Sequence, residues 1–410
     1  MADGRLERFL NRFGDVRGGE ARAALALSGY FFLITFTFYI LKPVKESFLI
    51  SFAPPGWWPY AELATALLIG FVVAFNARLL DRMPRRTFLT ASLLFFIASL
   101  FAFWFIFNVY QSQQFHSPMI DPSGMAFTLW LQIHIIQTWP FAVFVIAFCF
   151  WTDVFIAMTV TQFWIAVNDV FKAHQAKRLV GLFVTGGLFG GIAGSAVAAL
   201  ATFARAVRPG NLLLVAPGLL VLAAVTVNAV YAERQKIDPA AGDGSVAPAS
   251  RIGLLESFRA VRRSRYLLLL AAMLAAAMVS GSLINYQFKT VVKIAIGNPE
   301  QRTSFIAVLF LGILVISTGF HLVTTRRVLD SYGIRWALVV APAVLVAVSL
   351  SVFLIPAGLL LWWACAARGT DKTFDNTLSQ SVRELLYVPV PADIKYKGKI
   401  FIDMFVSKFA

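Results

Sequence analysis

Long apolar runs follow one another along most of the chain, separated by short polar segments. A helix needs about 20 apolar residues to cross the hydrocarbon core of a bilayer, and by this measure we expect about ten transmembrane spans. The expected spans are 23–50, 59–79, 87–109, 139–168, 178–204, 211–231, 266–294, 303–325, 335–354 and 356–386. The pattern therefore predicts an all-α, polytopic membrane protein.

Two segments outside the spans have patterns of their own. In residues 1–22, apolar positions at helical spacing alternate with arginines, which predicts an amphipathic helix lying on an anionic membrane surface; the alternative is a short soluble helix that packs on loops. Residues 238–250 have the Pro, Gly, Ser and Ala content of a flexible linker, and residues 254–265 predict a second surface helix.

The two halves of the chain share features at matching places. A Leu-Asp-x4-Arg turn follows the second expected span at Leu80–Arg86 and the eighth at Leu329–Arg335, although such a turn alone is weak evidence. Agreement in place, side and depth indicates a duplicated six-helix bundle, with the two halves related by an axis along the membrane normal. We expect an amphipathic helix at 1–22, an N-terminal bundle at 23–231, a cytoplasmic linker and surface helix at 232–265, and an incomplete C-terminal bundle at 266–410, two helices short of twelve spans.

The composition supports a membrane protein, and the distribution of charge over the loops predicts its orientation. The chain is 59% hydrophobic and 14% charged, whereas soluble domains are about 45–50% apolar. The net charge of +15 arises mainly from Lys and Arg in loops on one side, which predicts a cytoplasmic N-terminus facing anionic lipid. Membrane topology thus accounts for the positive charge, and we expect no binding of nucleic acid. The opposite loops carry only Arg205, Arg208 and Arg302.

Enzyme and metal chemistry find no support in the residue pattern. Cys149 and Cys365 both lie inside apolar runs, so neither a disulfide framework nor a metal cluster is indicated. The four histidines are scattered without ligand spacing, and no nucleophile or metalloprotease motif is present. We therefore expect no enzyme activity, no cofactor and no metal.

Charged residues within the apolar runs are the candidates for function. Each costs roughly 2.5–3.5 kcal/mol to insert unless it faces a partner or a water-filled cavity. Nearly all fall on the first, fourth, seventh and tenth expected spans, which line the cavity of a doubled bundle; Glu62 on the second is the main exception. The candidate substrate-binding residues from this pattern are Lys42, Lys45, Asp153, Lys289, Lys293, Asp371 and Arg383. The excess of cations predicts an anionic ligand, with phosphate the natural choice.

Each candidate also has a structural interpretation. Lys45 lies about 34 Å along its helix from Arg22 at 1.5 Å per residue, so the lysines could instead reach water at the outer rim of the bilayer. Arg383 could belong to a cytoplasmic helix end, and Asp371 could form a purely structural pair with a neighbouring cation. Glycines four residues apart in the fifth span (Gly186, Gly190, Gly194) predict tight helix packing, or a sliding contact during transport.

Several motifs resemble one family. Tyr39-Ile-Leu-Lys-Pro-Val-Lys-Glu-Ser47, Gln162–Asp169 with Gln175-Ala-Lys-Arg-Leu179, Ser264-Arg-Tyr266, Lys289 and Arg383-Glu-Leu-Leu-Tyr-Val-Pro389 are similar to the ATP/ADP translocase (nucleotide transporter, NTP/NDP exchanger) family. The resemblance implies a twelve-helix major-facilitator-like fold and exchange of ATP for ADP.

The same resemblance implies roles for particular positions. The family's first-helix lysine matches Lys45, and its tenth-helix lysine falls near Arg383. Its acidic residue on the fourth helix falls at Thr152, beside Asp153, and its acidic residue on the seventh falls at Asn285, which adds Asn285 to the candidate substrate-binding residues. These departures favour a phosphorylated or carboxylated substrate in general over ATP in particular.

We hypothesise a secondary transporter of the bacterial inner membrane that carries an anionic solute, such as a nucleotide, by alternating access between two helix bundles. Two alternatives remain open. One is a membrane scaffold or sensor that kept the fold without transport, and the other is a proton-coupled carrier of another organic anion, with Asp153 or Asp371 taking the proton.

Overall fold

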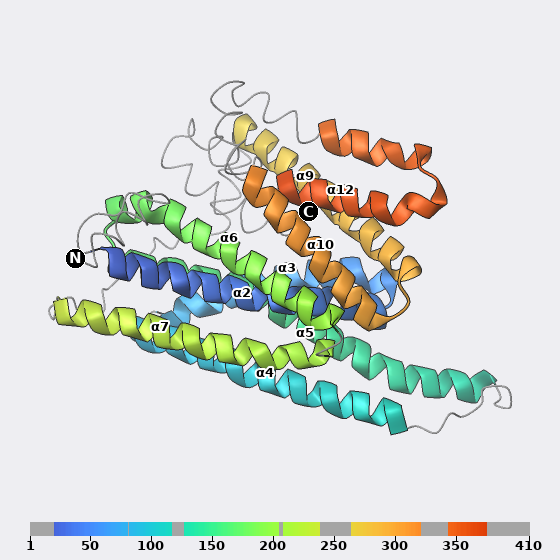
Figure 1. Ribbon diagram of the computed structural model, residues 1–410, viewed down its shortest axis with the longest axis horizontal. Helices are drawn as coiled ribbons and strands as arrows, with labels where there is room; N and C mark the ends of the chain where they lie inside the picture. Colours follow the sequence, from blue (N-terminus) through green and yellow to red (C-terminus); the bar gives the residue numbers. More distant parts are fainter. Residues whose placement is uncertain are drawn as a thin grey trace. The chain divides into compact units, whose positions relative to one another are not determined.

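The computed structural model describes residues 20–80, 82–116, 127–204, 208–237, 264–320 and 343–374. Within these ranges the chain is helical and contains no strand (Figure 1). The α-helices are α2 (Ala21–Phe52), α3 (Trp58–Leu80), α4 (Arg85–His116), α5 (Phe127–Val170), α6 (Ala173–Phe203), α7 (Val215–Ile237), α9 (Arg265–Ala295), α10 (Pro299–Phe320) and α12 (Leu360–Phe374). Short 3-10 helices are η1 (Pro55–Trp57), η3 (Pro209–Leu214), η5 (Val352–Leu354) and η6 (Ala357–Leu359). The predicted all-α class is confirmed.

Seven helices in the described ranges are long and apolar enough to cross a bilayer: Ala21–Phe52, Arg85–Phe107, Phe141–Val170, Arg178–Phe203, Pro209–Glu233, Arg265–Ala295 and Pro299–Gly319. Helix α3 occupies the expected span 59–79, and a shorter apolar helix at Ala343–Leu354 falls in the expected span 335–354. The predicted linker 238–250, nearly all of the amphipathic helix 1–22 and the surface helix 254–265, and the chain after residue 374 lie outside the described residues.

Contacts divide the chain into two compact units. Unit 1 comprises Met1–Pro54, Phe71–Gly244 and Asn298–Leu311, and unit 2 comprises Pro55–Gly70, Ser245–Gly297 and Gly312–Ala410. Helices α3 and α10 each contribute to both units. The predicted division into two six-helix bundles stays a prediction.

Helix α2 is the central helix of unit 1 and packs on α5, α6 and α7. Its closest neighbour is α6, because the glycines of α6 leave no side chain between the two backbones. A Cβ on Gly186 would lie 2.8 Å from the main-chain oxygen of Ser28, and one on Gly194 would lie 3.1 Å from Cβ of Tyr39. The predicted close packing at these glycines is therefore present in the structure.

Aromatic side chains fill the space between α4 and α5 in unit 1. The ring of Trp151 lies 5.6 Å from those of Phe96 and Phe103 and stacks on Phe155 at 5.7 Å between centroids. Its indole N–H donates to the hydroxyl of Ser99 at 2.9 Å, so the one polar atom of this large ring is satisfied inside the apolar layer. This layer packs the middle of α5 against α4.

Charged groups join the helices at one end of unit 1. Asp169, near the end of α5, is buried and accepts from Arg85 at the start of α4 and from the hydroxyl of Tyr231 on α7, the latter at 2.7 Å. Glu20 accepts from Gln175 at 2.5 Å and pairs with Arg178 on α6. Every member has a partner, so the buried charges are compensated.

Unit 2 is organised around α9, which packs on α12. The hydroxyl of Ser264 caps α9 by accepting from the N–H of Leu267 at 3.4 Å, and serine is a favoured N-cap residue. In the same unit, the indole N–H of Trp363 on α12 donates to the carbonyl of Val348 at 3.0 Å. Polar side chains of α9, including Asn285 and Lys289, face α3.

Candidate functional site

A lysine and a carboxylate meet inside unit 1. The ammonium of Lys45 on α2 lies 2.5 Å from Oδ1 of Asp153 on α5. The lysine side chain is 13% exposed and the aspartate 28%. Cys149, one turn before Asp153, places its Sγ 3.9 Å from the main-chain oxygen of Lys45, so α5 packs directly on this turn of α2. Lys45 is therefore held against a carboxylate, not extended to water at the rim.

Lys42 has a different environment, although it precedes Lys45 by less than one turn. Its ammonium lies 4.4 Å from the ring centroid of Phe310 and 5.0 Å from that of Tyr39, within the range of cation–π attraction. Pro43 follows it and has no N–H to donate within α2. The two lysines of the first span thus face different neighbours, an aromatic group and an acid.

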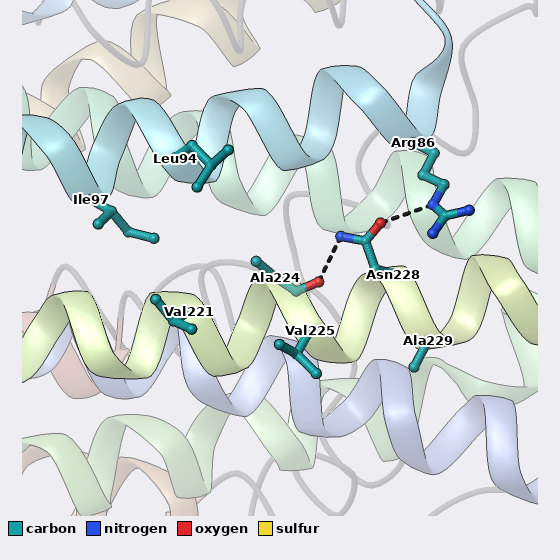
Figure 2. A pocket seen from close by; sticks show the side chains of 8 residues that line it. All are labelled: Arg86, Leu94, Ile97, Val221, Ala224, Val225, Asn228 and Ala229. Atoms are coloured by element: carbon teal, nitrogen blue, oxygen red, sulfur yellow. Dashed lines mark hydrogen bonds between the residues drawn. The ribbon is translucent and has the colours of Figure 1, made fainter.

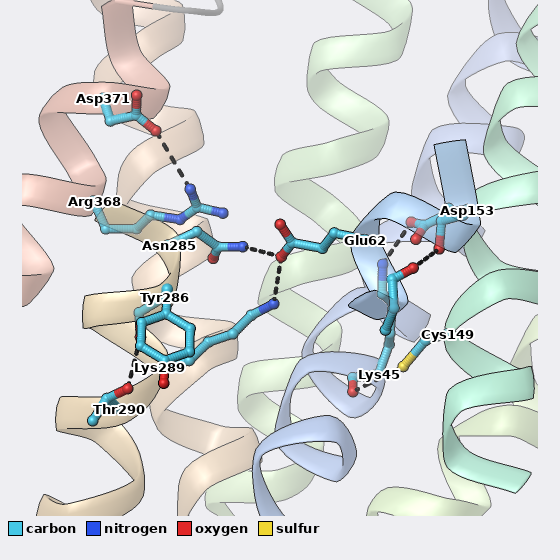
Figure 3. A network of polar contacts seen from close by, with 12 residues as sticks. Lys45, Glu62, Cys149, Asp153, Asn285, Tyr286, Lys289, Thr290, Arg368 and Asp371 are labelled. Atoms are coloured by element: carbon cyan, nitrogen blue, oxygen red, sulfur yellow. Dashed lines mark hydrogen bonds and ion pairs between the residues drawn. The ribbon is translucent and has the colours of Figure 1, made fainter. Parts of the chain in front are cut away.

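In unit 2, Lys289 is a buried cation whose side chain is 3% exposed. Its ammonium lies 3.0 Å from Oε1 of Glu62 on α3, and the amide of Asn285 donates to the same oxygen at 2.8 Å. Glu62 itself is 40% exposed. One carboxylate oxygen therefore holds two of the three α9 residues that the sequence nominates, Asn285 and Lys289 (Figure 3).

Glu62 is the functional candidate that the sequence pattern set aside. It lies on the second expected span, outside the four spans that a doubled bundle uses for its cavity. The sequence feature that could have identified Glu62 is its charge within an apolar run, because a carboxylate there carries an insertion penalty as the lysines do.

Three polar residues and one glycine of α9 recur every four positions. Gly281, Asn285, Lys289 and Lys293 follow one face of the helix, because residues four apart are neighbours on a helix surface. The ammonium of Lys293 lies 5.6 Å from the ring centroid of Trp58, a residue near the start of α3. The face that the lysines share thus turns toward α3 over at least two turns.

Asp371 lies on α12 between two cations. Its Oδ2 is 3.3 Å from Nη1 of Arg368 and 3.9 Å from Nζ of Lys372, and only 8% of its side chain is exposed. A Cβ on Gly281 would lie 3.3 Å from Oδ1 of Asp371, so the aspartate contacts α9 at the glycine. The pairing that the sequence offered as a structural alternative for Asp371 is present.

The eight nominated residues are thus distributed over both units. Lys42, Lys45 and Asp153 belong to unit 1, and Asn285, Lys289, Lys293 and Asp371 to unit 2, whereas Arg383 lies outside the described residues. In the described part of the chain, no group of three or more His, Cys, Asp and Glu side chains could hold a metal ion.

A shallow cavity of about 470 Å³ lies between α4 and α7 of unit 1 (Figure 2). Its walls are apolar except at one end, where Nε of Arg86 donates to Oδ1 of Asn228 at 2.8 Å. None of the nominated residues lines it, and its apolar walls are unsuited to a multiply charged solute. We therefore place the candidate site at the lysine–carboxylate pairs instead.

Lys45 and Lys289 thus lie inside apolar helices, each paired with a carboxylate. A sequence model described as the TLC ATP/ADP transporter matches residues 2–358. The chain belongs to this family. The expected resemblance is confirmed at the level of the family. The TLC ATP/ADP transporter match includes the segments around Lys45 and Lys289 and ends before Arg383.

Curated relatives support the TLC ATP/ADP transporter assignment over nearly the whole chain. The ADP,ATP carrier protein 1 of Chlamydia pneumoniae is 22% identical over 447 aligned positions, which cover 99% of this chain and 85% of the relative. The plastidic ATP/ADP-transporter of Solanum tuberosum is also 22% identical, with 98% of this chain and 68% of the relative covered.

Solved structures place this TLC ATP/ADP transporter family member in the major-facilitator-like fold. A bacterial homologue of the human lysosomal transporter Spinster superposes with a TM-score of 0.53 at 13% identity, over 96% of this chain and 80% of the other. The xylose transporter XylE from E. coli gives a TM-score of 0.52 at 13% identity, over 94% and 90%. The predicted fold is confirmed.

Proposed function

We propose that this protein is a secondary transporter that carries an anionic nucleotide across a membrane, in the manner of ATP/ADP exchange. Its family and the names of its relatives support a nucleotide as the solute. The observation that carries the proposal is the pair of Lys289 and Glu62, in which a nearly inaccessible cation is held by an acid that is itself 40% exposed.

The exposure of the two partners indicates how an anion would bind. In both units the acid is more exposed than the lysine, 40% against 3% for Glu62 and Lys289 and 28% against 13% for Asp153 and Lys45. A phosphate oxygen arriving from solvent would therefore meet the acid side of each pair. It could replace the carboxylate as the partner of the ammonium without leaving that ammonium uncompensated.

Exchange follows from the same requirement. Leaving a buried lysine without a counterion costs about 3–5 kcal/mol, so the lysine holds either its carboxylate or a solute anion. Release of one nucleotide is favoured when another anion takes its place. We propose that alternating access then presents the bound anion to one membrane face and afterwards to the other.

The membrane and the orientation are also part of the proposal. The excess of Lys and Arg on one side supports a cytoplasmic N-terminus in contact with anionic lipid. The bacterial relatives support the inner membrane of a bacterium.

Nucleotide uptake into liposomes tests the function. We expect vesicles preloaded with ADP to take up labelled ATP, and we expect Lys45→Ala and Lys289→Ala each to lower the initial rate by about tenfold or more. Lys172→Ala is the matched control, because Lys172 is exposed and its hydrogen bond to Gln175 uses the main-chain N–H. Undiminished uptake in both variants would remove the two lysines from the mechanism.

A second variant separates transport from folding. Replacing both partners of the unit 1 pair (K45Q with D153N) removes two charges together and leaves no uncompensated ion. We expect this double variant to unfold near the wild-type temperature and yet to transport poorly. Wild-type transport by a well-folded double variant would show that the pair has only a structural role.

The exposure of Glu62 also favours a second candidate, a proton-coupled anion carrier. Glu62 lies beside a buried lysine and is itself 40% exposed, so it is accessible to a coupling ion as well as to a solute anion. Uptake into empty vesicles, driven by an inward proton gradient, would support coupling. A strict requirement for nucleotide inside the vesicle would support exchange.

A further inference from the structure

Arg368 on α12 is a buried guanidinium whose hydrogen-bonding capacity is only partly used. Its side chain is 8% exposed, and Nη1 makes one long contact, 3.3 Å, to Oδ2 of Asp371. Its Nε is buried and has no hydrogen-bond partner among the described residues. Buried polar atoms in folded proteins are nearly always satisfied, so an unused donor on a buried cation points to a missing acceptor.

The position of Arg368 relates it to the nominated residues of α9. Asp371, which holds the guanidinium, contacts Gly281, and Asn285 and Lys289 follow Gly281 at successive turns of the same face. Figure 3 shows the Arg368 side chain extending from α12 to the side on which the amide of Asn285 reaches Glu62. All of these residues belong to unit 2.

Positive charge gathers along this face. Arg368 and Lys289 are both buried, and Lys293 lies one turn after Lys289 on the same face of α9. A low-polarity environment makes buried positive charge costly, and an anion reduces that cost. The face is thus suited to an anionic ligand.

We propose that Arg368 binds a phosphate group of the transported solute, and that Asp371 positions its guanidinium. The proposal rests on the transport function above and adds a residue that neither the charge pattern nor the family resemblance nominated as a ligand. Asp371 fixes one nitrogen, Nη1, and leaves Nε to donate to a phosphate oxygen. A planar guanidinium suits this task because its donors match the spacing of phosphate oxygens, which a lysine cannot reproduce.

Affinity measurements on the purified full chain test the assignment, with ADP and inorganic pyrophosphate as probes. We expect Arg368→Gln to raise the Kd for both probes by about tenfold or more, because a charge-assisted hydrogen bond is lost. Arg368→Lys keeps the charge and is expected to give an intermediate Kd. The matched control is Lys172→Gln, at an exposed lysine just before α6, which should change either Kd by less than about threefold.

Several outcomes decide the matter. Wild-type affinity in Arg368→Gln overturns the assignment while leaving nucleotide exchange intact, whereas absence of ADP binding by the wild type counts against exchange itself. If Arg368→Gln does not fold, Arg368→Lys decides, since wild-type affinity in that variant overturns the proposal. Phosphatidylglycerol in the detergent micelle is a further probe. Stabilisation by this lipid but not by ADP or pyrophosphate would identify a lipid headgroup as the ligand and overturn the proposal.

Discussion

Lys289 and Glu62 differ in exposure by more than tenfold, 3% against 40%, although their charged atoms lie 3.0 Å apart. The lysine cannot reach water, so its charge depends on whatever anion is adjacent. The acid is the more exposed partner, so it can leave the lysine at a smaller cost. At the scale of single residues, Lys289 is therefore the fixed partner of the pair and Glu62 the replaceable one.

Glu62→Gln tests which partner is replaceable. The amide keeps the shape of the side chain and removes the charge, so Lys289 loses its carboxylate when no solute is bound. We expect the ligand-free protein to lose about 1–3 kcal/mol of stability. We also expect the Kd for ADP to fall, because the phosphate no longer competes with an internal acid, while exchange becomes slower. Isothermal titration and uptake into liposomes measure these effects.

Glu300→Gln is the control, since Glu300 is exposed in the first turn of α10. It should alter neither stability nor affinity. If Glu62→Gln had the same stability and the same affinity for ADP as Glu300→Gln, Glu62 would have no part in holding Lys289.

Helices were the most predictable level of the structure. Helix α2 begins and ends within two residues of the expected span 23–50, and α9 within one residue of 266–294, because apolarity and length together define a spanning helix. Helix α5 starts at Phe127, well before its expected span 139–168. Apolarity measures the part of a helix that lies in lipid, and a helix can continue past that part through residues that do not break it.

The partners of the charged groups could not be predicted in the same way. Lys289 and Glu62 are 227 residues apart in sequence, and Lys45 and Asp153 are 108 apart. No local pattern specifies which distant helix turns its acid toward which lysine. Asp153 was nominated because it lay on an expected cavity helix, and Glu62 was passed over because it did not.

The glycines of α6 give a prediction at the scale of helix packing. Gly190 is buried, and a Cβ there would collide with the main-chain oxygen of Phe32 and the hydroxyl of Thr35 on α2. We expect Gly190→Ala to lower stability by about 1–3 kcal/mol, because α6 must move away from α2 to admit the methyl group. The apparent unfolding temperature in detergent measures the loss.

Gly218→Ala on α7 provides the comparison. Gly218 is exposed and has no atom within 4 Å of an added Cβ, so alanine should be neutral or slightly stabilising through its higher helix propensity. Equal unfolding temperatures for the two variants would show that α2 and α6 do not need their close approach.

At the scale of the whole molecule, binding of a solute distinguishes a transporter from a membrane scaffold or sensor that has the same fold. Both TM-scores above 0.5 come from transporters, but at 13% identity they establish the fold alone. A transporter must bind its solute in the folded state, and binding stabilises that state by about 2.7 kcal/mol when the ligand is present at 100 times its Kd.

We therefore expect ATP and ADP to raise the unfolding temperature of the full chain, and adenosine, which lacks the phosphates, to raise it little. The double variant K45Q with K289Q should lose the response to both nucleotides, because a phosphate has no buried ammonium left to neutralise in either unit. In a scaffold that kept the fold without transport, none of these ligands would change the unfolding temperature of the wild type or of the double variant. A response to ATP and ADP that survived the loss of both lysines would instead place the anion elsewhere, and Arg368 would be the next residue to replace.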